Sequence, residues 1–369
     1  MSGGLEKRNR RGARRRSREP RPYQPRPFAT IYGALLIAGV AGAAGVYFLL
    51  LALTHGGGAA LSTKLDVAKT ALLVVGGSGA LAGLYVAYRK QRTDEANHIR
   101  DQDKLFTERY TQAAAQLGNT AAAVRLAGVY ALARIADDSA RDRPTCLSVL
   151  CSYLRMAVDP DKGDPAETEV RRTAQTVLAK RLQPDHAGFW EDADVDLRGS
   201  HLIEFDLSGA VMRSINVAKA IFTGEAHFER VSVAGDAQFG DVKFEHYAGF
   251  LDTEFGGDAW FGGVAFEGYT EFSGAQFRGD ALFEAARFPG YSTFRKTEFL
   301  GATDFRHAIF TKDASFFEAR FDKQASFYCT KFEGDAEFAG AHMIAGAVTW
   351  PDGHSPSSQI EWTGPTPHD

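Results

Sequence analysis

The chain has 369 residues, of which 44% are hydrophobic and 24% are charged, and its formal net charge is −4. This length allows several domains. Only three cysteines occur, which excludes a disulfide framework and is typical of a protein from a reducing compartment. The small net charge hides an asymmetry, because basic residues dominate the first 27 positions and acidic residues dominate the C-terminal half.

The N-terminal segment, residues 1–27, is predicted to be a disordered basic cytoplasmic tail. It carries ten lysine or arginine residues against Glu6 and Glu19, and four prolines near its end keep it extended. Such a block attracts anionic lipid headgroups beside a membrane, at about 1 kcal/mol per basic residue, and in other settings it holds nucleic acid. Because an uncharged run follows at once, we favour a role in membrane topology and lipid contact, and nucleic acid is the less favoured partner.

Two uncharged runs then predict a two-helix transmembrane hairpin over residues 28–92. Phe28–Thr54 has 27 residues without a charge, and Thr70–Tyr88 has 19. About 20 apolar residues are enough to span a bilayer. A glycine-rich loop at residues 55–60 separates the runs. The first run is too long for a secretory signal, and a second span follows it directly.

Basic residues lie on the outer side of both runs, in the N-terminal tail and at Arg89, Lys90 and Arg92. By the positive-inside rule both termini are cytoplasmic, so we predict a multi-pass protein of the bacterial inner membrane. No ionisable residue lies in the middle of either span, which argues against a transport path. Small residues offer faces on which the two helices approach closely, namely Gly39, Gly42, Gly45, Gly79 and Gly83.

Residues 93–186 have helical periodicity and predict a short α-helical connector. Apolar residues recur at helical spacing in Val124–Ala136 and again in Leu147–Val158. Pro144 can start the second of these helices, and Asp164-Pro165 supplies an N-cap and a first-turn proline for a third. We favour a connector that also caps the N-terminal end of the next domain over a separate partner-binding module.

Residues 187–350 are predicted to form a β-solenoid. Between Phe228 and Met343, twenty of 22 regularly placed positions are phenylalanine, separated alternately by five and six residues, and a small or β-branched residue stands two positions before each. In an extended segment positions i−2 and i share a face, whereas on a helix these steps would scatter the rings. We interpret the rings as core, and an aromatic ligand groove is the disfavoured alternative. The 22 positions are Phe228, Val233, Phe239, Phe244, Phe250, Phe255, Phe261, Phe266, Phe272, Phe277, Phe283, Phe288, Phe294, Phe299, Phe305, Phe310, Phe316, Phe321, Phe327, Phe332, Phe338 and Met343.

Glycine recurs two residues after the core position in the six-residue links. Eight of eleven such positions are glycine, and the other three are His246, Lys312 and Lys323. We interpret these positions as corners that require a positive φ. The glycines are Gly224, Gly235, Gly257, Gly268, Gly279, Gly290, Gly301 and Gly334.

From Leu197 to Phe222 the core positions recur every five residues, and the run Asp206-Leu207-Ser208-Gly209-Ala210 resembles the pentapeptide-repeat family. The downstream part is similar to the phenylalanine-rich variant of that family, and the connector resembles the helical linker of its bacterial membrane-anchored type. The resemblance implies a right-handed quadrilateral β-helix with four short faces per coil. Coils of about 22 residues, stacked at about 4.8 Å, would then give a rod of roughly 30–35 Å.

The C-terminal end has its own candidates for covering the last coil. They are Met343, Ile344, Val348, Trp350 and Trp362. Residues 351–369 are rich in proline, serine and glycine and are predicted to be a flexible tail.

No sequence motif for nucleotide binding, metal binding or nucleophilic catalysis occurs, so we predict no enzyme, no catalytic, cofactor-binding or metal-binding residue, and no cofactor. Cys146 and Cys151 would point about 140° apart on a helix and cannot share a metal ion, and Cys329 is expected in the wall or on the surface of the solenoid. The solenoid histidines are expected to be solvated: His227, His246, His307 and His342.

The predicted function is a non-enzymatic, membrane-tethered scaffold that presents the solenoid to unknown protein partners. Residues 191–340 carry 26 acidic and 14 basic residues, and some proteins of the resembled family imitate a DNA duplex and bind gyrase as decoys. A DNA-mimicking modulator of this type II topoisomerase is therefore the alternative, although interleaved charge is typical of an ordinary solvated face. A third hypothesis is architectural, in which hairpins form homo-oligomers through their glycine faces.

Overall fold

The computed structural model describes residues 28–54, 61–157, 164–344, 347–351 and 360–363. The basic tail and the loop between the two uncharged runs therefore lie outside the described residues, as does Val158. The chain divides into two compact units, Met1–Gln102 and Asp103–Asp369. Five helices precede the strands: α1 (Phe28–Thr54), α2 (Leu61–Leu117), α3 (Ala122–Asp138), α4 (Arg143–Arg155) and α5 (Pro165–Arg181).

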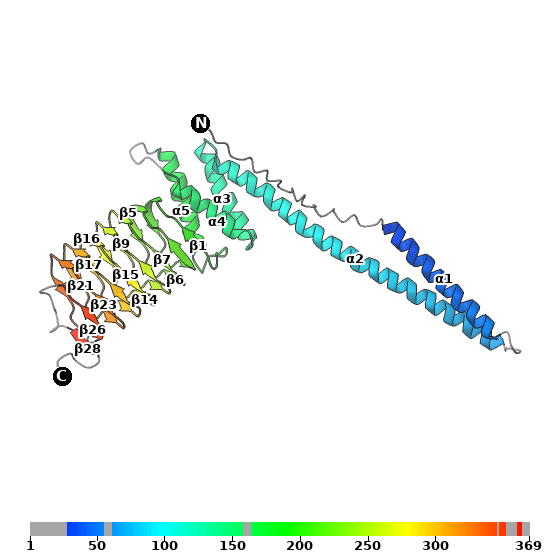
Figure 1. Ribbon diagram of the computed structural model, residues 1–369. Coiled ribbons are helices and arrows are strands. Elements are labelled where there is room, and N and C mark those ends of the chain that lie inside the picture. Colours follow the sequence, from blue (N-terminus) through cyan, green and yellow to red (C-terminus); the bar gives the residue numbers. More distant parts are fainter. Residues whose placement is uncertain (1–27, 55–60, 158–163, 345–346, 352–359, 364–369) are drawn as a thin grey trace, which may run out of the picture. The chain divides into compact units, whose positions relative to one another are not determined.

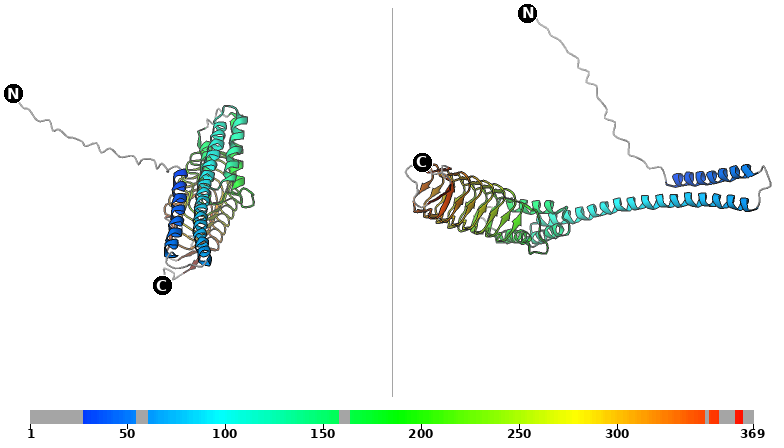
Figure 2. Two further views of the ribbon diagram at one scale, coloured as in Figure 1. Left: turned by 90° about the vertical axis from the view of Figure 1, so that its right-hand side faces the viewer. Right: turned by 90° about the horizontal axis from the view of Figure 1, so that it is seen from below.

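The N-terminal unit contains α1 and the first part of α2, which lie side by side (Figures 1 and 2). Ala43 of α1 is only 7% exposed. At four of the five predicted glycines no close contact is formed among the described residues, since a Cβ placed on Gly42, Gly45, Gly79 or Gly83 would meet no atom of a described residue within 4 Å. Among the described residues, no helix combines the length and the apolar character that a membrane crossing requires.

The helix α2 does not stop where the sequence suggested a boundary between residues 92 and 93. It continues as one helix of 57 residues to Leu117. The stretch after Arg92 contains no proline or glycine before Gly118, so nothing in it interrupts the helical hydrogen bonds. The predicted connector therefore begins inside a helix that it shares with the predicted hairpin.

The remaining connector helices confirm the predicted helix starts. Pro144 lies in the first turn of α4, and the Asp164 side chain accepts a hydrogen bond from the Ala166 backbone N–H at the start of α5. The predicted apolar faces are buried as one core, which includes Val129, Leu150 and Leu178. Their tight packing explains why three short helices are stable here without a long periodic stretch.

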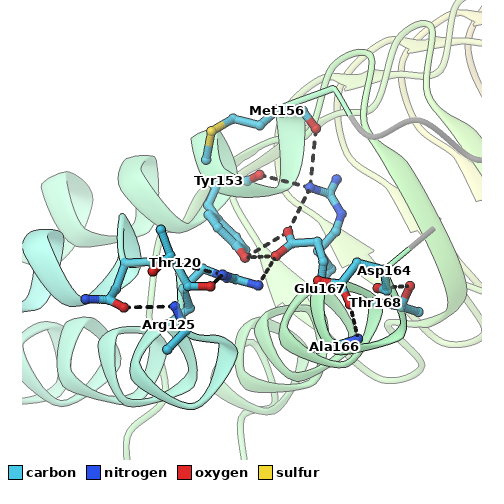
Figure 3. Close-up of polar contacts among 11 residues, drawn as sticks. Thr120, Arg125, Tyr153, Met156, Asp164, Ala166, Glu167 and Thr168 are labelled. Atoms are coloured by element: carbon cyan, nitrogen blue, oxygen red, sulfur yellow. Dashed lines mark hydrogen bonds and ion pairs between the residues drawn. The ribbon is translucent and has the colours of Figure 1, made fainter. Parts of the chain in front are cut away.

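A buried arginine closes the C-terminal end of α4. Arg171 of α5 is 4% exposed, and its guanidinium donates hydrogen bonds to the backbone carbonyls of Tyr153, Leu154 and Met156. Carbonyls in the last turn of a helix lack intrahelical donors, although that of Tyr153 also accepts from the Met156 backbone N–H at 3.2 Å. Glu167 lies next to Arg171, and both of its carboxylate oxygens lie 2.8 Å from the Tyr153 hydroxyl, which donates to one of them at a time (Figure 3). The network joins α4 to α5 in the interior of the connector.

The solenoid consists of three parallel sheets. The first contains β1 (Asp194–Asp196), β4 (Ser214–Asn216), β7 (Ala237–Gln238), β11 (Ala259–Trp260), β15 (Ala281–Leu282), β19 (Thr303–Asp304), β23 (Ala325–Ser326) and β27 (Val348–Thr349). The second contains β3 (Val211–Met212), β6 (Ser232–Val233), β10 (Glu254–Phe255), β14 (Gln276–Phe277), β18 (Glu298–Phe299), β22 (Arg320–Phe321), β26 (Ala341–Ile344) and β28 (Ile360–Thr363). The third contains β2 (His201–Asp206), β5 (Ile221–His227), β8 (Lys243–Phe244), β9 (Ala248–Gly249), β12 (Ala265–Phe266), β13 (Thr270–Glu271), β16 (Arg287–Phe288), β17 (Ser292–Thr293), β20 (Ile309–Phe310), β21 (Ala314–Ser315), β24 (Lys331–Phe332) and β25 (Ala336–Glu337).

The strand register shows the length of a coil. Phe255 pairs with Phe277, 22 residues later, and the same step recurs along all three sheets. The first coil is shorter, since Asp194 pairs with Ser214, 20 residues later. This difference follows from the sequence, because four links of five residues give 20 and two pairs of five and six give 22. Four strand positions fall in each coil, and the third sheet covers two adjacent faces because β5 pairs with both β8 and β9.

The phenylalanine core is confirmed. Every core phenylalanine from Phe228 to Phe327 is at most 2% exposed. Rings one coil apart stack almost parallel, as Phe250 and Phe272 do with 4.5 Å between centroids and 3° between planes. Rings on neighbouring faces meet edge to face, as Phe261 and Phe272 do at 5.4 Å and 90°. Both arrangements are the ones that aromatic quadrupoles favour.

The prediction that the corner glycines adopt a positive φ was wrong. Of the eight glycines in six-residue links, only Gly224 has a positive φ. The left-handed conformation falls instead in the five-residue links, where all eleven equivalent residues adopt it and eight of them are not glycine. They are Arg230, Asp241, Asp252, Gly263, Gly274, Ala285, Lys296, His307, Glu318, Cys329 and Gly340.

The six-residue corners need glycine because successive coils approach closely there. A Cβ on Gly301 would lie far inside 3.0 Å of the backbone carbonyl of Gly279. We expect Gly301→Ala to destabilise the solenoid by about 1–3 kcal/mol, because this overlap is with backbone and cannot be relieved by a rotamer change. Urea unfolding followed by circular dichroism measures the loss.

Gly262→Ala is the matched control for that substitution. Its Cβ would meet nothing closer than 3.7 Å, and Gly262 has no positive φ. Equal loss of stability in the two variants would show that close stacking is not the reason for the corner glycines.

Both ends of the solenoid are covered. At the N-terminal end, α5 packs against β2, the Val211 N–H donates to the Leu182 carbonyl at 2.8 Å, and Trp190 is fully buried. The connector therefore caps this end, as predicted. At the other end, the Trp350 ring stacks on that of Phe327 with 5.2 Å between centroids.

The C-terminal tail is not wholly unstructured. The strand β28, which lies in the segment predicted to be flexible, pairs with β26 and aligns Trp362 with Met343. Its four residues, Ile-Glu-Trp-Thr, favour a strand, but the proline- and serine-rich stretch before it hid that signal. The confirmed part of the prediction is that Met343 and Trp350 close the core.

Candidate interaction surface

The solenoid interior leaves no room for a ligand. Its core positions are filled by stacked rings, so the aromatic ligand groove considered from the sequence does not exist. Among the described residues, no group of three or more histidine, cysteine or acidic side chains could hold a metal ion. Any recognition by this domain must use residues that point outward from its four faces.

One face carries a column of tyrosines, and we call it the tyrosine face. It consists of the C-terminal end of β5 followed by β9, β13, β17, β21 and β25. Tyr247, Tyr269 and Tyr291 stand one coil apart just before β9, β13 and β17. The first two rings stack with 5.8 Å between centroids. Tyr269 is 43% exposed and Tyr291 is 57% exposed, so the column opens toward solvent along the face.

Carboxylates lie around Tyr247, the first tyrosine of this column. The Tyr247 hydroxyl lies 3.2 Å from both Glu229 Oε1 and Glu271 Oε2 and can donate to only one of them at a time. Burial and the two carboxylates raise the pKa of Tyr247, so the phenol remains a donor. Gly249 makes the arrangement possible, since a Cβ there would overlap Glu229 and the Tyr247 hydroxyl.

His227 belongs to the same cluster and is not a solvated surface residue, contrary to the prediction. Its Nδ1 lies 3.0 Å from Glu229 Oε1, and its Nε2 lies 3.2 Å from Glu225 Oε2. Partial burial lowers the pKa of His227, but hydrogen bonds to Glu229 and Glu225 and the charges of Glu229 and Asp206 outweigh it, so the pKa is raised above 6.5. His246, His307 and His342 are exposed, as predicted.

The raised pKa of His227 makes stability depend on pH. The protonated imidazole is favoured in the folded state, so its contribution is complete below about pH 6.5 and is lost as pH rises through the higher folded value. We expect the drop in unfolding midpoint between pH 6 and pH 8 to be smaller in His227→Gln than in the unmodified chain. Urea titrations at both pH values measure it. An unchanged drop would assign the pH dependence to other groups.

An arginine is already held on the tyrosine face. The Arg295 guanidinium carbon lies 4.3 Å from the centroid of the Phe317 ring, one coil further on, and Arg295 lies 3.6 Å from the Glu337 carboxylate. This is a cation–π contact combined with an ion pair, on an exposed surface. The face therefore offers an aromatic ring and a carboxylate at the right separation for one guanidinium.

Elsewhere on the solenoid, several acidic side chains are paired with basic ones. Lys243 contacts Glu245 at 3.1 Å, and Arg320 contacts Asp322 at 2.6 Å. Arg306 lies 2.7 Å from Asp304. These exposed pairs add little stability, but they neutralise the carboxylates locally. The surface is therefore less like a polyanion than the count of acidic residues suggests.

The junction of connector and solenoid contains a groove in which two of the three lining arginines form ion pairs. Its walls include Arg155 and Arg213, which are paired with Asp196 and Asp194. Cys151 lies at its base but is 1% exposed, and burial raises the pKa of its thiol to about 12. The protonated, buried thiol and the ion pairs indicate that this region is a structural contact between the connector and the solenoid.

Comparison with known families agrees with this architecture. A model described as pentapeptide repeats, in nine copies, matches residues 261–309 and 294–342. The solenoid is thus similar to pentapeptide repeats over residues 261–342. The matched part begins at Phe261, so the phenylalanine-rich coils before it and the five-residue links between Leu197 and Phe222 precede it. No curated protein and no solved structure matches the chain.

The tyrosine column of this solenoid was visible in the sequence but was not recognised. Tyr247, Tyr269 and Tyr291 are separated by 22 residues, which is one coil. The core was found from an eleven-residue period, which is half a coil. Residues eleven apart lie on opposite faces, so this period does not reveal a column that occupies one face. The signal appears only when outward residues are compared at the full coil length.

Proposed function

We propose that this protein is a non-enzymatic scaffold in which two helices tether a right-handed, four-sided pentapeptide-repeat solenoid to the inner membrane of a bacterial cell. The solenoid then presents its outer faces to protein partners. Solenoids of this kind act typically through surfaces, since each coil contacts only its neighbours and encloses no cleft. The observation that supports recognition most directly is the exposed column of Tyr269 and Tyr291.

The support for the tether is uncovered apolar surface on both helices. Ile37 is 70% exposed and Phe48 is 68% exposed on α1, while Leu73 is 75% exposed and Leu84 is 71% exposed on α2. A helix with apolar residues all round needs an apolar environment. Phe28–Thr54 also contains no charged residue. The basic residues before α1 and after Tyr88 are consistent with cytoplasmic termini.

Alkaline carbonate extraction of cell membranes tests the tether. We expect the full-length chain to stay in the pellet, as a protein held by spanning helices does. Release into the supernatant would disprove the tether and would leave the uncovered apolar surface to be explained by association between chains.

Crosslinking in native membranes tests the scaffold. The full-length chain is compared with a version that ends after Pro184, and recovered partners are identified by mass spectrometry. A partner that is lost only from the shortened version supports recognition by the solenoid. Recovery of the same partners from both versions would move recognition to the N-terminal half.

The topoisomerase hypothesis makes a different prediction. A decoy of the DNA duplex should inhibit or protect gyrase in a supercoiling assay, whereas the scaffold should leave supercoiling unchanged. The paired charges, such as Lys243 with Glu245, favour the scaffold.

The architectural hypothesis can also be separated from the scaffold. A Cβ added at Gly79 or Gly83 would meet no atom of a described residue within 4 Å. Loss of function in Gly79→Leu or Gly83→Leu would therefore indicate a contact between copies, and retained function would argue against such contacts.

A further inference from the structure

Both ring nitrogens of His227 face carboxylates. Its Nδ1 lies 3.0 Å from Glu229 Oε1, and its Nε2 lies 3.2 Å from Glu225 Oε2. A carboxylate can only accept a hydrogen bond, and a neutral imidazole carries a single N–H. Both contacts are therefore hydrogen bonds only when the imidazole is protonated. Loss of that proton leaves the lone pair of one ring nitrogen facing a carboxylate, which is a repulsive contact.

The two carboxylates differ in how firmly the rest of the chain holds them. The Glu229 side chain is 14% exposed, whereas that of Glu225 is 66% exposed. Glu229 also accepts from two hydroxyl groups, Ser208 Oγ at 3.0 Å and Tyr247 Oη at 3.2 Å. Among the described residues, the only partner of the Glu225 carboxylate is the His227 imidazole. When this imidazole is neutral, Glu229 therefore keeps the Nδ1–H hydrogen bond and Glu225 turns into solvent.

The other titratable groups around His227 come from three further segments of the solenoid. Asp206, at the end of β2, pairs in register with His227, and its charge also favours the imidazolium. The Tyr247 ring, just before β9, lies 5.4 Å from the imidazole, and its raised pKa keeps the phenol protonated. Glu271 of β13 lies 3.2 Å from the same phenol. Among the described residues, no lysine or arginine forms an ion pair with either glutamate that contacts the imidazole.

We propose that His227 is a proton-controlled clamp on the tyrosine face, which holds Glu225 when the imidazole is charged and releases it when the imidazole is neutral. Release removes one positive charge from this face and adds one free carboxylate at the N-terminal end of the tyrosine column. Because the pKa of His227 is raised above 6.5, Glu225 is released as pH rises through that higher value. The clamp consists of contacts within the solenoid alone, so it does not depend on the proposed scaffold function.

The titration of His227 in the full-length chain is the first test. NMR of the chain with isotope-labelled histidine side chains gives the midpoint, and the signal of His227 is identified by its absence from His227→Gln. We expect Glu225→Gln to lower this midpoint by about half a pH unit, because the amide replaces an exposed negative charge that favours the imidazolium. A midpoint that Glu225→Gln leaves unchanged would overturn the proposal.

Double-mutant cycles then distinguish the two carboxylates. Urea unfolding is measured for His227→Gln, for Glu225→Gln and for both together, one pH unit below the midpoint and two units above it. Below the midpoint, we expect the pair to change the unfolding equilibrium constant by about threefold beyond the product of the single effects. Above the midpoint this coupling should vanish. The same cycle with Glu229→Gln should show coupling at both pH values, since the neutral imidazole still donates from Nδ1.

Glu267→Gln is the matched control, because Glu267 is an exposed glutamate outside this cluster. Its cycle with His227→Gln should show no coupling at either pH. Coupling between His227 and Glu225 that persists above the midpoint would contradict the release of Glu225. Loss of both couplings together would mean that the imidazole leaves both carboxylates, which also contradicts the clamp. Circular dichroism checks the fold of each variant, and the NMR titration of Glu225→Gln decides the question if Glu229→Gln does not fold.

Discussion

Replacing Phe272 with alanine is expected to lower the free energy of unfolding of the solenoid by about 3–5 kcal/mol. Phe272 is fully buried, and it stacks between Phe250 at 4.5 Å and Phe294 at 5.0 Å, with 3° between the planes in both pairs. Its removal eliminates the apolar burial of a ring and leaves a cavity between coils whose backbones are fixed by ladder hydrogen bonds. Those coils cannot collapse onto the cavity, which places the cost toward the upper part of the range.

Urea unfolding measured by circular dichroism checks this loss, and Phe317→Ala is the matched control. Phe317 is half-buried on the tyrosine face and its ring contacts Arg295, so its loss should cost about 1 kcal/mol or less. Because each coil contacts its neighbours alone, the variant should unfold first around Phe272. Equal destabilisation by both substitutions would contradict the distinction between core and surface phenylalanines.

Replacing Arg171 with leucine is expected to destabilise the connector by about 3–5 kcal/mol. The substitution removes the guanidinium donor from the carbonyls of Tyr153, Leu154 and Met156, although the Tyr153 carbonyl keeps the Met156 backbone N–H at 3.2 Å. A buried acceptor that is left unsatisfied costs about 1–3 kcal/mol. Glu167 would also lose a nearby positive charge, at 4.0 Å. Thermal unfolding followed by circular dichroism at the helical band measures the effect.

The neighbouring Arg172 provides the control for this prediction. Its side chain is 47% exposed and pairs with Glu204, which is 64% exposed, so Arg172→Leu removes a solvated ion pair worth about 0–1 kcal/mol. Similar stability in the two leucine variants would mean that the Arg171 hydrogen bonds contribute nothing net. A large loss only for Arg171→Leu would establish it as the cap of α4.

The solenoid core could be predicted from the sequence because one residue type marks every inward position. Alternating steps of five and six exclude a helix, and the small residue two positions earlier defines the inner face of an extended segment. The helix starts at Pro144 and Pro165 were predictable for a similar local reason, since proline fits the first turn. Each of these signals is carried by residues close together in the chain.

The sequence-based predictions that were wrong concern contacts between coils. The sign of φ in the five-residue links is set by ladder hydrogen bonds, and residues as different as Ala285, Lys296 and Glu318 adopt the same value. The six-residue corners require glycine for space, as at Gly301, and space depends on the coil beneath. The cluster of His227 and Tyr247 likewise joins residues almost one coil apart in sequence, so no local pattern reveals it.

The repeat of the core residues is half as long as one coil, and this determines how a deletion would affect the solenoid. The interior repeats every eleven residues, whereas a coil closes after 22. A deletion of eleven residues would therefore preserve the core and all its alternating links, yet turn everything beyond it by half a revolution. The fold would remain stable, but each column of outward-facing side chains would be interrupted at the deletion and would continue on the opposite face. The core residues of such a molecule follow the same pattern on opposite faces. Only the solvent-exposed residues therefore distinguish one face from the opposite one.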